Sequence, residues 1–69
     1  MTNIKILMDN NILFQFNDVV NLTMHHDFKG NSTIQFFAWK ETKDSRYLYE
    51  SRWRIGTDSD VESIIITHQ

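Results

Sequence analysis

Every second residue is a large apolar one along several segments of this chain, and this period constrains the fold more than any other feature. Residues 4, 6 and 8 are apolar, and residues 12, 14 and 16 repeat the pattern. Successive side chains of a β-strand point to opposite faces of its sheet, so the period predicts strands with one apolar face each. The chain has no proline, internal repeat or low-complexity tract, and we therefore expect residues 1–69 to form a single small domain.

Five segments have the pattern of strands, and residues that favour turns separate them. The expected strands are residues 4–8, 12–16, 33–41, 46–55 and 61–67. The separating segments are Asp9-Asn10-Asn11, Asn17-Asp18, Thr42-Lys43-Asp44-Ser45 and Gly56-Thr57-Asp58-Ser59-Asp60. Asparagine, aspartate, serine and glycine favour tight turns, because their backbones or short polar side chains suit turn conformations.

The segment 19–29 fits either a strand or a helix. As a strand it places residues 20, 22, 24, 26 and 28 on one face and residues 19, 21, 23, 25 and 27 on the other. As a helix it aligns residues 20, 24 and 28, with Asn17 or Asp18 as N-cap and Gly30 after the C-terminus. We favour the strand, because valine, threonine, asparagine and histidine are poor helix formers. Gly30-Asn31 would then form the two-residue loop of a hairpin.

Two of the expected strands carry most of the aromatic residues. Residues 33–41 are apolar on both faces, with Ile34, Phe36 and Ala38 on one and Phe37 and Trp39 on the other. A strand of this kind is expected at the centre of a sheet. Residues 46–55 place tyrosine, tryptophan and isoleucine on one face, and arginine, leucine and glutamate on the other.

These patterns predict an all-β fold, a small antiparallel meander of five or six strands that forms a barrel-like or strongly twisted sheet. A single flat sheet of this size would leave an apolar face in water, so closure or a partner is expected. The alternative is an α+β fold in which residues 18–29 are helical.

Composition limits the class of protein further. A chain of 69 residues with no cysteine has no disulfide to supplement a small core, and such domains often self-associate, so a homo-oligomer is expected. No segment approaches the roughly 20 apolar residues of a membrane helix, and residues 1–8 do not resemble a signal peptide. We therefore expect a cytoplasmic protein that makes no membrane contact.

No motif points to catalysis, a metal or a cofactor. His25 and His26 are adjacent, so on a strand they point to opposite faces and cannot chelate one ion together. The acidic run from Asp58 to Glu62 lacks the glycine and the distal glutamate of a calcium loop, and we interpret it as a solvated turn. A nucleophile beside a base, or a carboxylate pair flanking a pocket, is not evident. The sequence predicts a protein that is not an enzyme.

Basic residues gather in the aromatic part of the chain. Residues 31–56 carry five lysines and arginines and three acidic residues. Residues 1–30 carry two lysines and three acidic residues, and residues 57–69 carry three acidic residues and no lysine or arginine. The rings would in part fill the core, and the arginines would pair with Glu41, Glu50 and Glu62 across strands. Nine aromatic residues nevertheless exceed what one thin layer covers, so several are expected to stay exposed.

Exposed tryptophan, tyrosine and arginine together are typical of binding surfaces. The candidate protein-binding residues are Trp39, Arg46, Tyr47, Tyr49, Arg52, Trp53 and Arg54. We expect a non-enzymatic module that binds a larger host protein stoichiometrically, for example an inhibitor or adaptor encoded by a phage or mobile element, with strand addition along residues 64–66. The alternative is a small barrel that binds single-stranded nucleic acid by base stacking. We favour it less, since the flanking segments are acidic.

Overall fold

The computed structural model describes residues 1–8, 11–56 and 61–68, and these form six strands in two three-stranded antiparallel sheets. The strands are β1 (Thr2–Met8), β2 (Asn11–Phe16), β3 (Val20–His26), β4 (Ser32–Glu41), β5 (Arg46–Ile55) and β6 (Ser63–His68). The described part of the chain contains no helix. The all-β prediction is therefore confirmed, and the alternative with helical residues 18–29 is wrong. It follows that none of the described segments is a helix able to cross a membrane.

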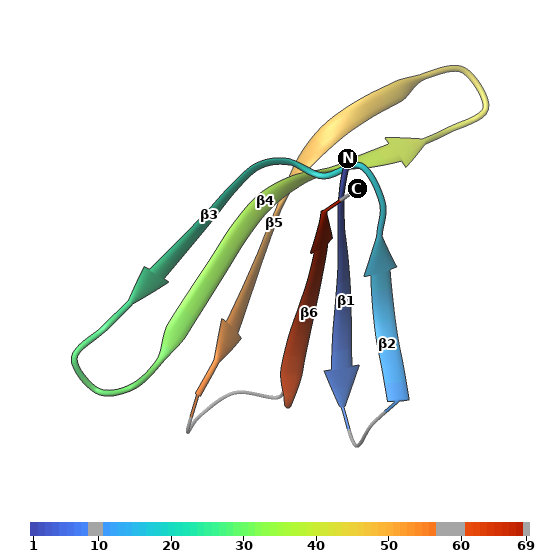
Figure 1. Cartoon of the computed structure of the whole chain (residues 1–69). Coiled ribbons are helices and arrows are strands. Elements are labelled where there is room, and N and C mark those ends of the chain that lie inside the picture. Colours follow the sequence, from blue (N-terminus) through green and yellow to red (C-terminus); the bar gives the residue numbers. More distant parts are fainter. Residues whose placement is uncertain (9–10, 57–60, 69) are drawn as a thin grey trace.

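The sheets have the strand orders β2-β1-β6 and β3-β4-β5 (Figure 1). Each consecutive pair within a sheet is a hairpin, and the last strand returns to pair with the first, from Thr2 opposite His68 to Leu7 opposite Ser63. This is the antiparallel meander predicted from the sequence. The predicted closure is not complete, because β2 is not hydrogen-bonded to β3, nor β5 to β6.

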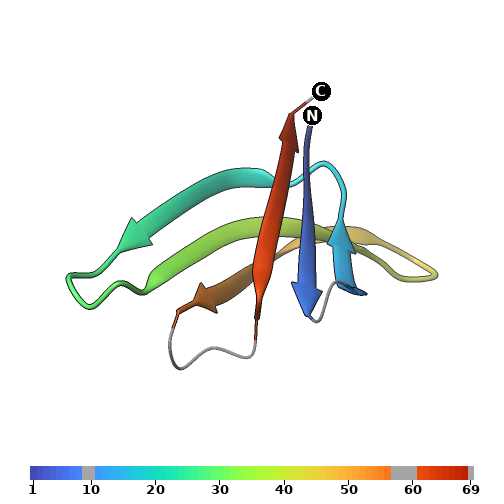
Figure 2. The same ribbon diagram turned by 60° about the horizontal axis from the view of Figure 1, so that its bottom comes forward.

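Two short backbone contacts mark the places where the chain passes between the sheets. The Val19 N–H donates to the Thr2 carbonyl oxygen at 3.0 Å before β3 begins. After β5, an isolated parallel bridge joins Ile55 to Val61. Figure 2 shows that β6 and β1 cross over the β3-β4-β5 sheet and do not run alongside its strands. The barrel is thus replaced by two crossing sheets.

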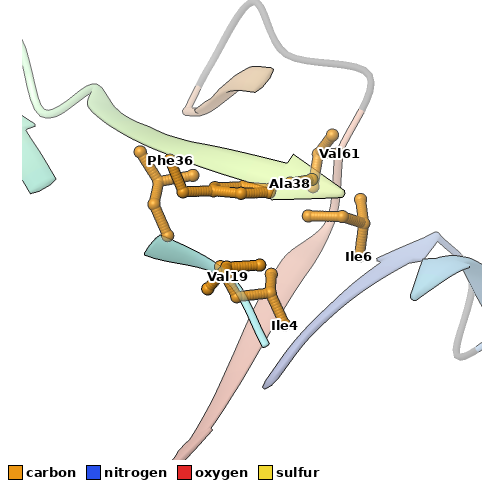
Figure 3. Close-up of a cluster of buried hydrophobic side chains, with 7 residues drawn as sticks. Ile4, Ile6, Val19, Phe36, Ala38 and Val61 are labelled. Atoms are coloured by element: carbon orange, nitrogen blue, oxygen red, sulfur yellow. The ribbon is translucent and has the colours of Figure 1, made fainter. Parts of the chain in front are cut away.

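The core lies where the two sheets cross, and we call the face of each sheet that points toward the other its inner face. The buried side chains are Ile4, Ile6, Val19, Ile34, Phe36, Ala38 and Val61. Figure 3 shows Ile4 and Ile6 of β1 opposite Phe36 and Ala38 of β4. Both strands are central in their sheets, as predicted for β4. Each large side chain buried in this way contributes roughly 1.5–3 kcal/mol.

A bulge in β3 changes which valine enters the core. Val20 lies opposite Phe37 and Thr23 opposite Gln35, so β3 holds one residue more than β4 over this stretch. Asn21 takes a φ of 55°, a conformation that asparagine tolerates better than most residues. The prediction that Val20 shares a face with residues 22 and 24 is therefore wrong. Val19 is buried instead. Val20 lies on the opposite face of the sheet, which points away from the other sheet and which we call the outer face.

The loop between β3 and β4 is longer than predicted. It spans residues 27–31, and not the two-residue Gly30-Asn31 loop expected from the sequence. The Asp27 carboxylate accepts hydrogen bonds from the Lys29 N–H at 2.8 Å and the Asn31 N–H at 2.9 Å. A carboxylate that accepts backbone N–H groups in this way closes a loop locally. Phe28, at its tip, is 95% exposed.

The remaining turns agree with the sequence where the structure describes them. The Thr42 N–H donates to the Ser45 carbonyl oxygen at 2.8 Å in the predicted turn between β4 and β5. Residues 9–10 and 57–60 of two further predicted turns lie outside the described residues. The last strand begins at Ser63, two residues later than predicted.

We expect the substitution Phe36→Ala to lower the free energy of unfolding by about 3–5 kcal/mol, because the ring is fully buried. This approaches the whole stability of a chain of this size, roughly 3–10 kcal/mol. Urea denaturation measures the change. Phe28→Ala removes the same side chain from an exposed loop and should change stability by no more than about 0.5 kcal/mol. Equal effects of the two variants would contradict the assignment of the core.

A second prediction concerns the bulge. Asn21→Val should lower the free energy of unfolding by about 1–2 kcal/mol, since a β-branched residue is strained at a φ of 55°. Asn21→Gly is the control, because glycine adopts positive φ without a steric cost. Denaturation midpoints of the two variants should therefore differ clearly; if valine and glycine were equally tolerated, the bulge would be absent.

Candidate functional site

The outer face of the β3-β4-β5 sheet carries an apolar band that no other element covers in the described structure. Val20 lies opposite Phe37, and Trp39 lies opposite Leu48, so these four side chains cross all three strands on one face. Val20 and Trp39 are each 37% exposed and Leu48 is 42% exposed, whereas Phe37 is half-buried. We call this face, together with the polar groups at its two ends, the outer surface.

At one end of the outer surface, Arg46 lies over Trp39. The guanidinium carbon is 4.2 Å from the centroid of the indole ring. The Arg46 Nε also pairs with the Glu41 Oε1 at 3.3 Å, across the β4–β5 hairpin. The cation–π contact and the ion pair together hold the guanidinium group over the ring. The predicted pairing of an arginine with Glu41 across strands is therefore confirmed.

The other end of the outer surface is an open hollow of about 710 Å³. Its lining is polar and comes from all three strands: His25, Thr33, Gln35, Arg52 and Arg54. The Arg52 Nη2 donates to the Gln35 Oε1 at 3.3 Å and to the Glu50 Oε1 at 3.1 Å. The hollow therefore presents two guanidinium groups together with hydroxyl, amide and imidazole groups, beside the apolar band.

The charges of the outer surface partly cancel. Arg46 pairs with Glu41, and Arg52 pairs with Glu50 along its own strand, not across strands as predicted. The side chains in both pairs remain about half exposed or more. Exposed ion pairs contribute only about 0–1 kcal/mol to stability. A partner that offers carboxylates can therefore compete for these arginines at small cost.

The structure divides the seven predicted site residues between two faces. Trp39, Arg46, Arg52 and Arg54 lie on the outer surface, whereas Tyr47, Tyr49 and Trp53 lie on the inner face. Neighbouring residues of a strand necessarily point to opposite faces. One partner lying flat on the outer surface therefore reaches the arginines and Trp39, but not the two tyrosines or Trp53.

Trp53 belongs to an aromatic cluster between the sheets. Its ring centroid is 5.2 Å from that of Phe14 and 6.3 Å from that of Phe16. Phe16 in turn meets Phe36 edge-on, with centroids 5.1 Å apart. The Trp53 Nε1 donates to the Ser51 Oγ at 2.8 Å. These contacts assign Trp53 mainly to packing.

Much aromatic surface stays exposed, as the composition predicted. Of the nine aromatic residues, only Phe36 is fully buried. Tyr47 and Tyr49 are exposed on the inner face of the β4–β5 hairpin, and Phe14 is half exposed on β2. The core at the crossing is too small to cover more than part of this ring surface.

Several residues of the outer surface were not among the predicted site residues. They are Val20, His25, Thr33, Gln35, Phe37 and Leu48. Val20 and His25 belong to the outer face through the pairing register of β3 with β4, which a single sequence does not specify around a bulge. The sequence carried two signals for this face: Phe37 shares a face of its strand with Trp39, and Leu48 shares a face of its strand with the arginines.

His25 and His26 point to opposite faces, as neighbouring residues of a strand must. His25 lies opposite Thr33 on the outer face, and the ring Nδ1 of His26 is 2.7 Å from the Ser32 Oγ. Within residues 1–8, 11–56 and 61–68, no three or more His, Asp or Glu side chains gather in a way that could hold a metal ion. Most of the acidic run from Asp58 to Glu62 lies outside the described residues.

Comparisons with protein-family models, with curated proteins and with solved structures gave no match for this chain.

The Asp27 carboxylate next to the hollow gives a pH-dependent prediction. Its pKa is lowered below the ordinary 3.8, chiefly by the hydrogen bond from the Asn31 N–H, with the Arg54 charge acting in the same direction. A carboxylate with a depressed pKa stabilises the fold above 3.8, and this contribution is lost as the pH falls through the lower folded-state pKa. Relative to wild type, Asp27→Asn should therefore lose stability near neutral pH, and the difference should shrink in acid.

Denaturation midpoints from neutral pH down to below 3.8 measure this difference. Asp44→Asn, which removes a carboxylate from the β4–β5 turn, is the matched control. A difference for Asp27→Asn that does not vary with pH would contradict the role of the ionised carboxylate in the loop.

Proposed function

We propose that this protein is a non-enzymatic binding module that acts stoichiometrically on a larger protein through its outer surface. The observation that carries the proposal is the uncovered apolar band across β3, β4 and β5, with arginines at both ends. Large apolar side chains such as Trp39 and Leu48 that face water together in one band mark an interaction site.

The make-up of the outer surface supports a protein partner. Protein interfaces are enriched in tryptophan, phenylalanine and arginine at their centres, with polar groups around them. Trp39 and Phe37 supply rings on the rigid central strand, and stacking limits the freedom of Arg46 before any partner binds. Less side-chain entropy is then lost on binding. The matching partner surface has an apolar centre and carboxylates that reach Arg46 and Arg52.

The charges favour a protein over single-stranded nucleic acid. A nucleic-acid groove needs an excess of cations along the backbone path. On the outer surface, Glu41 and Glu50 lie within ion-pair distance of Arg46 and Arg52. The whole chain carries a net charge of −2. Both features weaken attraction to phosphates, whereas a mixed protein surface tolerates them.

Affinity capture tests the proposal. The immobilised protein should retain a defined partner from host lysate, and the double variant Trp39→Ser/Leu48→Ser should reduce its recovery about tenfold or more, because both exposed side chains leave the interface centre. Recovery should persist in about 1 M salt, where charges are screened within about 3 Å, and after nuclease treatment.

Ile65→Ser is the matched control. Ile65 is 47% exposed on the outer face of the other sheet, so its replacement should leave recovery unchanged. Equal recovery with the double variant and with wild type would remove the outer surface from the binding site. Capture of nucleic acid alone, lost in salt, would replace the proposal with the nucleic-acid alternative.

A further inference from the structure

β5 is a long strand at the edge of its sheet. It runs for ten residues with β4 on one side. On its other side, the described residues show a backbone bridge only at Ile55, to Val61. A long edge of this kind can pair with a strand of another chain, and proteins usually protect such edges with proline, bulges or covering loops. β5 contains no proline, and its pairing with β4 has no register shift.

The sequence of β5 is complementary to itself in one antiparallel register. A two-fold axis perpendicular to the sheet leaves each residue of the second copy on the same face as in the first, and residues directly opposite each other in an antiparallel pair also share a face. A residue can therefore lie opposite itself or opposite a residue an even number of positions away. This places the axis at a residue, and not between two residues. With the axis at Ser51, Glu50 lies opposite Arg52 of the second copy, and Tyr49 lies opposite Trp53 of the second copy. Each pair occurs twice.

Neighbouring registers lack this match. An axis at Glu50 places Glu50 opposite its own copy, and an axis at Arg52 does the same for Arg52. An axis at Tyr49 brings Arg46 opposite Arg52. Like charges directly opposite each other destabilise a sheet, whereas opposite charges and aromatic pairs stabilise it. An axis at Leu48 avoids like charges but pairs only residues 46–50. Ser51 therefore gives the longest register free of repulsion.

We propose that the protein forms a homodimer in which β5 pairs antiparallel with β5 of a second copy about Ser51. The pairing joins two β3-β4-β5 sheets into one sheet of six strands. Ser51 suits the axis, because its small hydroxyl side chain can face its own copy without charge or bulk. Toward the Ile55 end, the bridge to Val61 limits the pairing to about residues 48–54.

Side chains on both faces support this register. On the outer face, Glu50 already contacts Arg52 of its own chain at 3.1 Å, so the dimer completes a group of four alternating charges. On the inner face, Tyr49 is 36% exposed and lines a hollow together with Phe16 of the Trp53 cluster. The second copy brings its own Trp53 next to this tyrosine. An exposed ring and a charged pair thereby gain partners in the same contact.

The dimer would set the two outer surfaces side by side on one sheet. A partner with two matching sites would then be held more tightly than by one copy, because its second contact forms within the same complex. The homodimer does not rest on the proposed function, because it is argued from the edge of β5 and not from the apolar band, although both contacts use Arg52.

Reciprocal charge exchange tests the pairing. Sedimentation equilibrium should give about twice the chain mass of 8.3 kDa for wild type at high concentration. Glu50→Arg and Arg52→Glu should each weaken dimerisation tenfold or more, since each places like charges opposite one another. The double variant Glu50→Arg/Arg52→Glu restores opposite charges in every pair and should dimerise again. Circular dichroism checks that all variants stay folded.

The chain has no cysteine, so a single introduced thiol reports the register directly. Ser51→Cys should form an interchain disulfide under mild oxidation, because residue 51 faces its own copy at about 4.5–5.5 Å between Cβ atoms. Leu48→Cys is the control, since the two copies of residue 48 lie about 20 Å apart along the strands. Dimers that crosslink equally at both positions would contradict the register.

Other results would overturn the homodimer itself. A wild-type protein that remains monomeric at all accessible concentrations would exclude it. A dimer that both single charge variants leave intact would place the contact elsewhere. Either result leaves the outer surface as a binding site, because capture of the partner through Trp39 and Leu48 is measured separately. Conversely, a wild-type protein that dimerises but captures no partner would overturn the proposed function and leave the homodimer in place.

Discussion

The packing of β1 against β4 is the interaction on which the rest of the structure depends. Ile4 and Ile6 come from the centre of one sheet, and Phe36 comes from the centre of the other. These strands meet where the sheets cross (Figure 3). A chain of 69 residues can fill one such contact region and little more, because a small domain buries only about 60% of the surface that its unfolded chain exposes.

The small core explains why so much ring surface faces water. The inner faces carry the aromatic cluster around Trp53, but the β4–β5 hairpin keeps Tyr47 and Tyr49 exposed. Both faces of β4 carry large apolar side chains, and the β2-β1-β6 sheet covers only one of them. The outer surface therefore follows from the architecture: two layers enclose one core and leave two outer faces uncovered.

The face and the edge of the β3-β4-β5 sheet have different properties. The face presents Trp39, Leu48 and partly neutralised arginines, which suit the surface of a larger protein. The edge of β5 presents backbone groups and a sequence complementary to itself about Ser51, which suits a second copy. The sequence predicted Trp53 and the two tyrosines as part of one binding site with the arginines. In the structure they lie on the inner face, along the edge strand β5. This separation follows from the two-residue period of a strand.

The sequence by itself determined β1, β2, β4, β5 and β6, the turn between β4 and β5 and the two faces of those two strands, because a two-residue period is a local property that each segment carries alone. It left segment 19–29 open between strand and helix, and it predicted a shorter loop after β3 than the structure has. Only the tertiary structure decided how the sheets cross, that Val19 and not Val20 enters the core, and which residues line the hollow beside Arg52. The choice of valine and the place of His25 in the hollow depend on the register between β3 and β4, which the bulge at Asn21 shifts by one residue. A one-residue shift moves side chains to the other face, and it results from contacts between distant segments.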